Sequence, residues 1–178
     1  MGKPPMDLTA LVACTLPRST TVYPDALLRG IYRSTRTIAL VGASPNWNRP
    51  SYFVMRYLQR KGFRVIPVNP RAPDEPILGE QVYPDLESIP VAVDVVDVFR
   101  RPEEVPDIAN AAARIGAKVL WLQLGIRSPE AAAIAGLAGL VFIEDHCMKI
   151  EYGRLSGELA WSGINTRIIS GRRVGPVR

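Results

Sequence analysis

The stretch T-I-A-L-V-G-A-S-P-N-W-N-R-P-S, residues 37–51, decides how the rest of the sequence is interpreted. Its first five residues form an apolar run that stops at Gly42, and a polar loop with prolines follows as far as Pro50. A short apolar run ending at glycine is typical of a buried strand that enters a loop. From Ser51 to Gly62 apolar residues recur on one face, which predicts an amphipathic helix ending at glycine.

The alternation of strand and helix continues along most of the chain. Residues 63–68 predict a second strand, so a complete strand–helix–strand unit fits within residues 37–68. A short helix is expected from Asp25, and the long loop of residues 69–90 is expected to hold a short strand around Val82. Further strands are predicted at residues 91–99, 118–122 and 140–143, and helices at 102–115 and 128–138. This order predicts an α/β fold, a Rossmann-like doubly wound parallel sheet in a single domain.

Length and composition agree with one globular domain. The chain has 178 residues, of which 47% are hydrophobic and 22% charged. We expect an N-terminal arm and short helix at 1–36, the ligand-binding domain at 37–155 and a basic tail at 156–178. No apolar run reaches the roughly 18 residues that span a bilayer, and no signal segment is recognised, so a cytoplasmic protein is expected.

Charge and cysteine content argue against several other classes. The formal net charge is +5, and the basic excess is concentrated after Arg154. Arginines on a solvated terminus are more common than a polyanion site, so nucleic acid is not expected as a partner. Cys14 and Cys147 are too few for a disulfide framework or a zinc site, and no metal is expected.

The loop after the first strand is the first candidate site, because ligands bind at the carboxyl ends of parallel strands. Glycine permits a tight turn, and the amides at a helix N-terminus attract phosphate. The loop has one glycine and not the three of G-x-G-x-x-G, which makes NAD less favoured. An ordinary strand-to-helix turn with a capping serine remains the alternative. The candidate residues here are Gly42, Ala43, Ser44, Asn46, Arg49 and Ser51.

The residues at the end of the second strand narrow the choice of ligand further. An NAD-binding domain usually carries an acid there for the ribose hydroxyls, but this chain has Asn69, Pro70 and Arg71. A guanidinium suits an adenosine nucleotide with an additional ribose phosphate, and both coenzyme A and NADP are of this kind. The alternative for Arg71 is a solvated loop arginine.

Several ordered sequence blocks resemble the small stand-alone CoA-binding protein family, which is related to the N-terminal CoA-binding domain of the succinyl-CoA synthetase α-subunit. The blocks are V-G-A-S at 41–44, V-N-P-R at 68–71, L-G-E-Q-V-Y-P at 78–84, V-D-V-F-R-R-P at 96–102, W-L-Q-L-G-I at 121–126 and D-H-C-M-K-I-E at 145–151. The resemblance extends from Thr37 to Leu155.

The resemblance implies that CoA lies across the strand ends. Its pyrophosphate would lie against residues 42–51 and its nucleotide near Asn69 and Arg71. Phe99, Arg100 and Arg101 would add contacts, and the turn containing Gln123, Gly125 and Ile126 would face the pantetheine arm.

The end of the domain departs from the family, which often has arginine before the cysteine where this chain has His146. We interpret His146 as structural or surface-exposed and Cys147 as a buried thiol, and we assign no catalytic residue. The leading hypothesis is a CoA- or acyl-CoA-binding protein without evident catalytic machinery. Such a protein could form a homodimer or bind a partner protein. The alternatives are an NADP-dependent oxidoreductase and an interaction protein with a vestigial nucleotide site.

Overall fold

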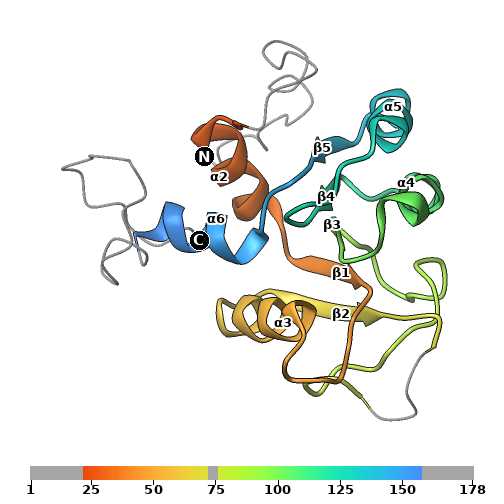
Figure 1. Ribbon diagram of the computed structural model, residues 1–178. Coiled ribbons are helices and arrows are strands. Elements are labelled where there is room, and N and C mark those ends of the chain that lie inside the picture. Colours follow the sequence, from red (N-terminus) through yellow and green to blue (C-terminus); the bar gives the residue numbers. More distant parts are fainter. Residues whose placement is uncertain (1–21, 72–75, 158–178) are drawn as a thin grey trace, which may run out of the picture.

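The computed structural model of the chain describes residues 22–71 and 76–157 (Figure 1). One sheet of five parallel strands lies at the centre, in the order β2-β1-β3-β4-β5. This confirms the predicted Rossmann-like α/β fold. The predicted arm, up to residue 21, and the tail from residue 158 lie outside the described residues. The strands are β1 (Thr37–Val41), β2 (Arg64–Val68), β3 (Val95–Val98), β4 (Val119–Leu122) and β5 (Val141–Ile143).

Helices cover both faces of the sheet, as Figure 1 shows. On one face lie α2 (Asp25–Ser34), α3 (Pro50–Arg60) and α6 (Met148–Ser156), and on the other α4 (Val105–Arg114) and α5 (Pro129–Ala138). A strand buried on both faces needs apolar side chains in both directions, which explains the nearly continuous apolar runs. No helix in the described ranges is both long and apolar enough to cross a membrane.

The two helices α2 and α6 pack together although they stand at opposite ends of the described chain. The buried Tyr32 hydroxyl of α2 donates a hydrogen bond of 2.8 Å to the carbonyl oxygen of Met148 in α6. The centre of the Tyr32 ring also lies 5.9 Å from the centre of the Trp121 ring and 5.2 Å from that of the Tyr152 ring. Helix α2 therefore belongs to the same hydrophobic core as the sheet.

Some predicted boundaries differ from the structure. The strand expected from residue 91 begins only at Val95, because the Asp94 carboxylate accepts hydrogen bonds from the amides of Arg36 and Thr37 at 2.8 and 3.1 Å. The helix expected from residue 102 begins with a separate 3₁₀ turn, Pro102–Glu104, before α4. The strand expected near Val82 is a single bridge in which Tyr83 pairs with Val68.

Within residues 22–71 and 76–157, a single carboxyl group lies completely inside the core. Asp97 of β3 has no exposed surface, and only one of its oxygens has a partner, the side-chain amide of Gln123 at 2.8 Å. The other oxygen, Oδ2, makes no hydrogen bond to any described residue. Burial raises the pKa of Asp97 to about 7, because the charged form loses its hydration and gains only one donor.

We predict that this carboxyl group makes folding stability fall as pH rises. The unfolded carboxyl titrates near pH 4, so between about pH 4 and 7 the folded state retains a proton that the unfolded state has released. The free energy of unfolding should therefore drop between pH 5 and pH 8, by on the order of 3 kcal/mol from this group. Asp97→Asn, which resembles the protonated acid, should lack this drop in urea denaturation. Equal pH dependence of both proteins would contradict the assignment.

Candidate functional site

The strand order reverses beside β1, which has β2 on one side and β3 on the other. The chain leaves β1 toward α3 on one face and leaves β3 toward α4 on the opposite face (Figure 1). Such a switch point opens a crevice that holds ligands in folds of this class. Here the two loops touch: a Cβ at Gly42, whose φ is +90°, would lie 2.9 Å from the carbonyl oxygen of Phe99. Glycine is therefore required for the loops to approach.

The loop between β1 and α3 is held by its own polar groups. The amides of Gly42 and Ala43 both donate to the carbonyl oxygen of Val68, at 2.9 and 3.2 Å. The Ser44 hydroxyl accepts from the Asn46 amide at 3.2 Å. Since the first two amides are already bonded within the sheet, the backbone donors that an anion could use lie further along the loop and in the first turn of α3.

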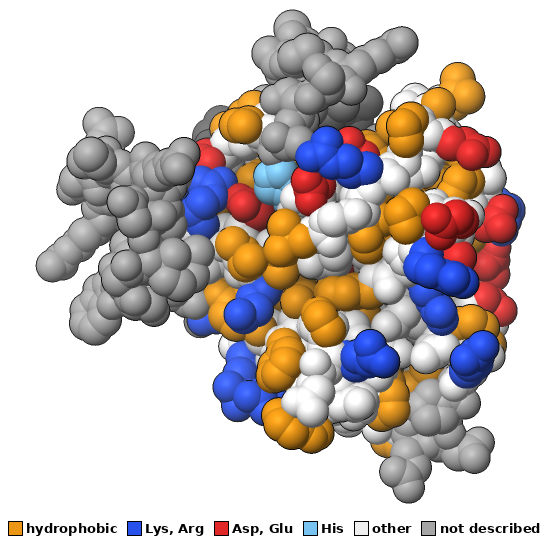
Figure 2. All heavy atoms as spheres, viewed as in Figure 1, with side chains coloured by type: hydrophobic (Ala, Val, Ile, Leu, Met, Phe, Trp, Pro, Cys, Tyr) orange, Lys and Arg blue, Asp and Glu red, His pale blue; other side chains and the backbone are white. Residues whose placement is uncertain are grey.

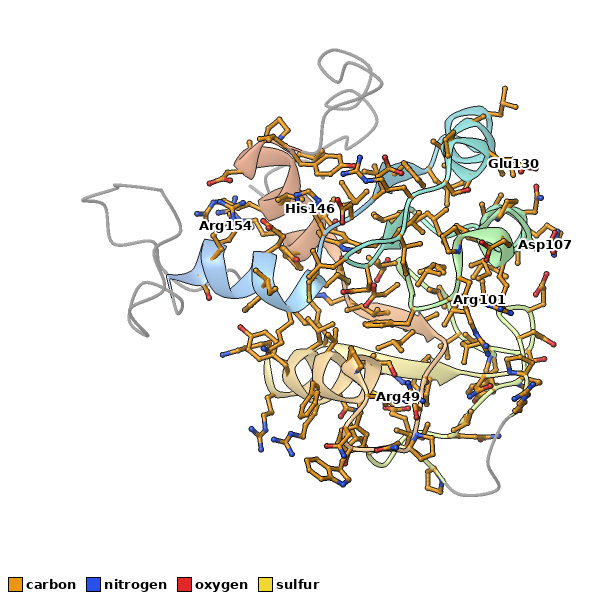
Figure 3. The ribbon with its side chains drawn as sticks, viewed as in Figure 1. Arg49, Arg101, Asp107, Glu130, His146 and Arg154 are labelled. Carbon is orange, nitrogen blue, oxygen red and sulfur yellow. The ribbon has the colours of Figure 1, made fainter. Side chains whose placement is uncertain are left out.

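The remaining loop residues differ in exposure. Arg49 stands at the N-cap position of α3 and is exposed, as Figure 3 shows, so its charge can reach a ligand. Ser51, in contrast, is buried with only 4% of its surface exposed. The buried side chain of Ala43 packs into the core on the α3 side of the sheet. Of the predicted loop contacts, Asn46 and Arg49 are exposed and Ser44 is half-buried, and none of the three lines either cavity described below.

Asn69 joins the three loops that follow β1, β2 and β3. Its side-chain NH₂ donates to the carbonyl oxygen of Ala43 at 2.9 Å. Its side-chain oxygen accepts from the Arg71 amide at 2.9 Å and from the Arg100 guanidinium at 3.2 Å. An aspartate here has no hydrogen to give Ala43, so the amide side chain fits all three contacts. From the sequence, Asn69 was noted because it stands where an NAD-binding domain has an acid. Its role in joining the three loops was not predicted.

The arginines at the strand ends are only partly neutralised. Arg100 lies 3.8 Å from the Glu104 carboxylate, and Arg101 lies 3.3 Å from the same carboxylate. Arg71 is exposed and forms no ion pair with any described residue. Figure 3 places Arg101 in the segment between β3 and α4. One carboxylate faces two arginines here, and the backbone amide of Arg71 is bonded to the same Asn69 side chain as Arg100. The three arginines therefore retain positive charge for an anionic ligand.

Two cavities flank the loop after β1. The first, of about 330 Å³, is lined by Val41 and Val68 at the strand ends, by Pro70 and Arg100, and by residues of the segments 84–87 and 103–111. Five of these lining residues are acidic: Asp85, Glu87, Glu103, Glu104 and Asp107. The second, of about 470 Å³, lies between α3 and α6. Both volumes are in the range of small-molecule sites. The loop starts next to Val41 in the first cavity and ends at Pro50 in the second, so it connects the two.

The turn after β4 is fixed by Asp145, which the sequence analysis did not single out. The Asp145 carboxylate accepts from the Gly125 amide at 2.7 Å and from Arg127 at 2.6 Å. These bonds, the amide bond first, hold the pKa of Asp145 below its usual value. The Gly125 amide is thus occupied, and the Ile126 side chain packs against the core on the α5 side. Gln123 donates its NH₂ to Asp97, so its side-chain oxygen is the group left for a ligand.

His146 packs against a neighbouring ring, and Cys147 is buried. The Nδ1 atom of His146 lies 2.8 Å from the carbonyl oxygen of Glu144, and the ring packs edge-on against Tyr23. Figure 3 shows His146 beneath α2. Cys147 is buried, and burial raises the pKa of its thiol. Among the described residues no three His, Cys, Asp or Glu side chains group closely enough to hold a metal ion.

The comparison with known families agrees with this geometry. The model of the CoA binding domain matches residues 36–153. The chain belongs to this family. A curated relative, the uncharacterized protein YneT of Bacillus subtilis, is 33% identical over 127 residues, which are 71% of this chain and 93% of that protein. This CoA-binding domain thus spans nearly the whole of its relative.

Solved structures with the same fold include small proteins of similar size. A hypothetical protein from Pyrococcus horikoshii is 38% identical, with a TM-score of 0.73, and the match covers 79% of this chain and 98% of that one. A Thermus thermophilus protein is 36% identical, with a TM-score of 0.71 over 74% and 98% of the two chains. A dinucleotide-forming acetyl-coenzyme A synthetase from Ca. Korarchaeum cryptofilum shares the fold at 24% identity and a TM-score of 0.52, over 60% of this chain and 25% of that chain.

We predict that replacing Gly42 costs more stability than its backbone conformation alone explains. Gly42→Ala should lower the free energy of unfolding by about 2 to 4 kcal/mol, because strain adds to the contact with Phe99. The matched control is Gly139→Ala, where φ is also positive (+71°) but a Cβ would meet nothing within 4 Å. It should cost only about 1 to 2 kcal/mol. Urea denaturation measures both, and equal losses would show that the two loops do not need to touch.

Proposed function

We propose that the protein binds coenzyme A or an acyl-CoA across the carboxyl ends of its strands. The observation that carries the proposal is that the loop after β1 begins at Val41, which lines the first cavity, and ends at Pro50, which lines the second. An adenosine group in the first cavity, a pyrophosphate along the loop and a long arm reaching the second cavity follow the order of groups in CoA. Membership in the CoA-binding domain family supports the same ligand.

The charges support the orientation of the nucleotide. Arg71, Arg100 and Arg101 follow β2 and β3, and among the described residues only Glu104 pairs with them. Of the three, Arg100 lines the first cavity, whose other lining residues include five acids. A guanidinium binds phosphate through paired hydrogen bonds, so the 3′-phosphate would lie on the arginines and away from these acids. Arg49, at the N-terminus of α3, lies on the loop where the pyrophosphate would pass.

We propose no catalytic step at this site. A nucleophile needs a base within hydrogen-bond reach, and among the described residues no hydrogen bond joins the His146 ring to a serine, threonine or cysteine side chain. A reactive cysteine needs a lowered pKa, whereas burial raises that of Cys147. The protein therefore acts as a binding module, and NADPH should bind more weakly than CoA because the loop lacks the glycines of a dinucleotide fold.

We predict that Arg71→Ala weakens CoA more than dephospho-CoA. If Arg71 contacts the 3′-phosphate, its loss removes a charge-assisted hydrogen bond of about 1.5 kcal/mol, or roughly tenfold in affinity. Dephospho-CoA lacks that phosphate and should bind both proteins almost equally. Titration calorimetry of the two proteins with the two ligands isolates the interaction energy between Arg71 and the 3′-phosphate.

Arg36→Ala serves as the control, because Arg36 is exposed beside the amino end of β1, at the opposite edge of the sheet. It should leave both affinities unchanged. Equal losses of CoA and dephospho-CoA in Arg71→Ala would show that Arg71 acts on the fold or on the pyrophosphate, and Arg100 and Arg101 would then be tested. Saturable NADPH binding tighter than that of CoA would overturn the proposed ligand.

A further inference from the structure

The cavity between α3 and α6, which we call the α3–α6 groove, has apolar walls. Phe53 and Val54 of α3 and Ile150 of α6 line it. Phe53 and Ile150 are 43% and 41% exposed, so part of each side chain is open to a ligand. Figure 2 shows hydrophobic side chains gathered on this face, with lysines and arginines beside them. Apolar side chains that converge on a groove favour a ligand with an apolar segment.

The same groove is lined by three cations and no acid. Arg56 and Arg60 stand one turn apart on α3, and Lys149 stands in the first turn of α6. Neither arginine forms an ion pair with any residue that the structure describes. The Lys149 ammonium lies 5.7 Å from the centre of the Tyr57 ring, which also lines the groove. The groove therefore combines apolar walls with a net charge that suits an anion.

The groove adjoins the turn that would hold the pantetheine arm. The Asp145 amide donates to the Ile126 carbonyl at 3.2 Å, and the His146 amide donates to the Leu122 carbonyl at 3.3 Å. These bonds fix the segment before Cys147 against the turn after β4. Cys147 itself lines the groove. A CoA arm that passes Gln123 and this turn would bring its sulfur to the end of the groove.

We propose that the α3–α6 groove holds the acyl group of an acyl-CoA whose chain ends in a carboxylate. The inference rests on the proposed function, because it needs the CoA arm to end at Cys147. The apolar walls bury the methylene groups, and the rim cations bind the terminal carboxylate. A fully apolar chain would leave Arg56, Arg60 and Lys149 without an anion, and an inorganic anion would gain nothing from Phe53 and Ile150.

The test compares two acyl-CoAs of equal length. Glutaryl-CoA ends in a carboxylate where pentanoyl-CoA ends in a methyl group, so the difference in their affinities reports the terminal charge. Calorimetry on the full-length chain should show glutaryl-CoA binding about five- to tenfold tighter, as expected when two or more partly exposed charge pairs act together. In the double variant Arg56→Gln, Arg60→Gln this preference should fall to about twofold or less.

The matched control is the double variant Arg33→Gln, Arg36→Gln, which removes the same charge from exposed positions outside the groove. It should keep the preference for glutaryl-CoA. Pentanoyl-CoA binding as tightly as glutaryl-CoA to the wild type overturns the inference, and so does an equal loss of CoA and both acyl-CoAs in the groove variant. Binding of CoA itself tests the proposed function separately. If the wild type binds no CoA, the proposed function is wrong, whatever the acyl-CoAs do.

Discussion

The arrangement of the site depends on the close approach of two backbones at Gly42 and Phe99. Phe99 donates its amide to the carbonyl of Val41, and the missing side chain of Gly42 leaves room for the Phe99 carbonyl. The chains after β1 and β3 can then part toward opposite faces from one point. Because a parallel sheet offers its strand ends at one edge, this point becomes the centre of the crevice.

Around that point polar side chains add to apolar packing in holding the loops in place. Asn69 joins three of them, and Asp145 fixes the turn after β4. Each bond occupies a donor that a ligand would otherwise use, so the groups left free are few and fixed in position. A site organised in this way before binding loses little conformational entropy when a ligand arrives. Among the described residues, the one buried side-chain oxygen without a partner is Oδ2 of Asp97, on the strand that leads to the crevice.

The apolar strands and their order along the chain could be predicted from the sequence because burial on both faces leaves an apolar run. The helix predicted at 128–138 is confirmed as α5, and Ser128 caps it by accepting a hydrogen bond from the Ala131 amide at 3.2 Å. The start of β3 could not be predicted, since it depends on the contact of Asp94 with the distant amide of Arg36. Helix α6 was not predicted, because it is short and contains Gly153. The role of Asn69 required the fold, since its partners are far apart in sequence.

The most direct test of the account is the position of CoA in a crystal structure of the complex. The account predicts the adenosine group in the cavity beside Val41 and Val68, the pyrophosphate along residues 42–50, and the sulfur near Cys147 at the end of the α3–α6 groove. A CoA molecule in the reverse direction, or one bound away from the strand ends, would contradict it.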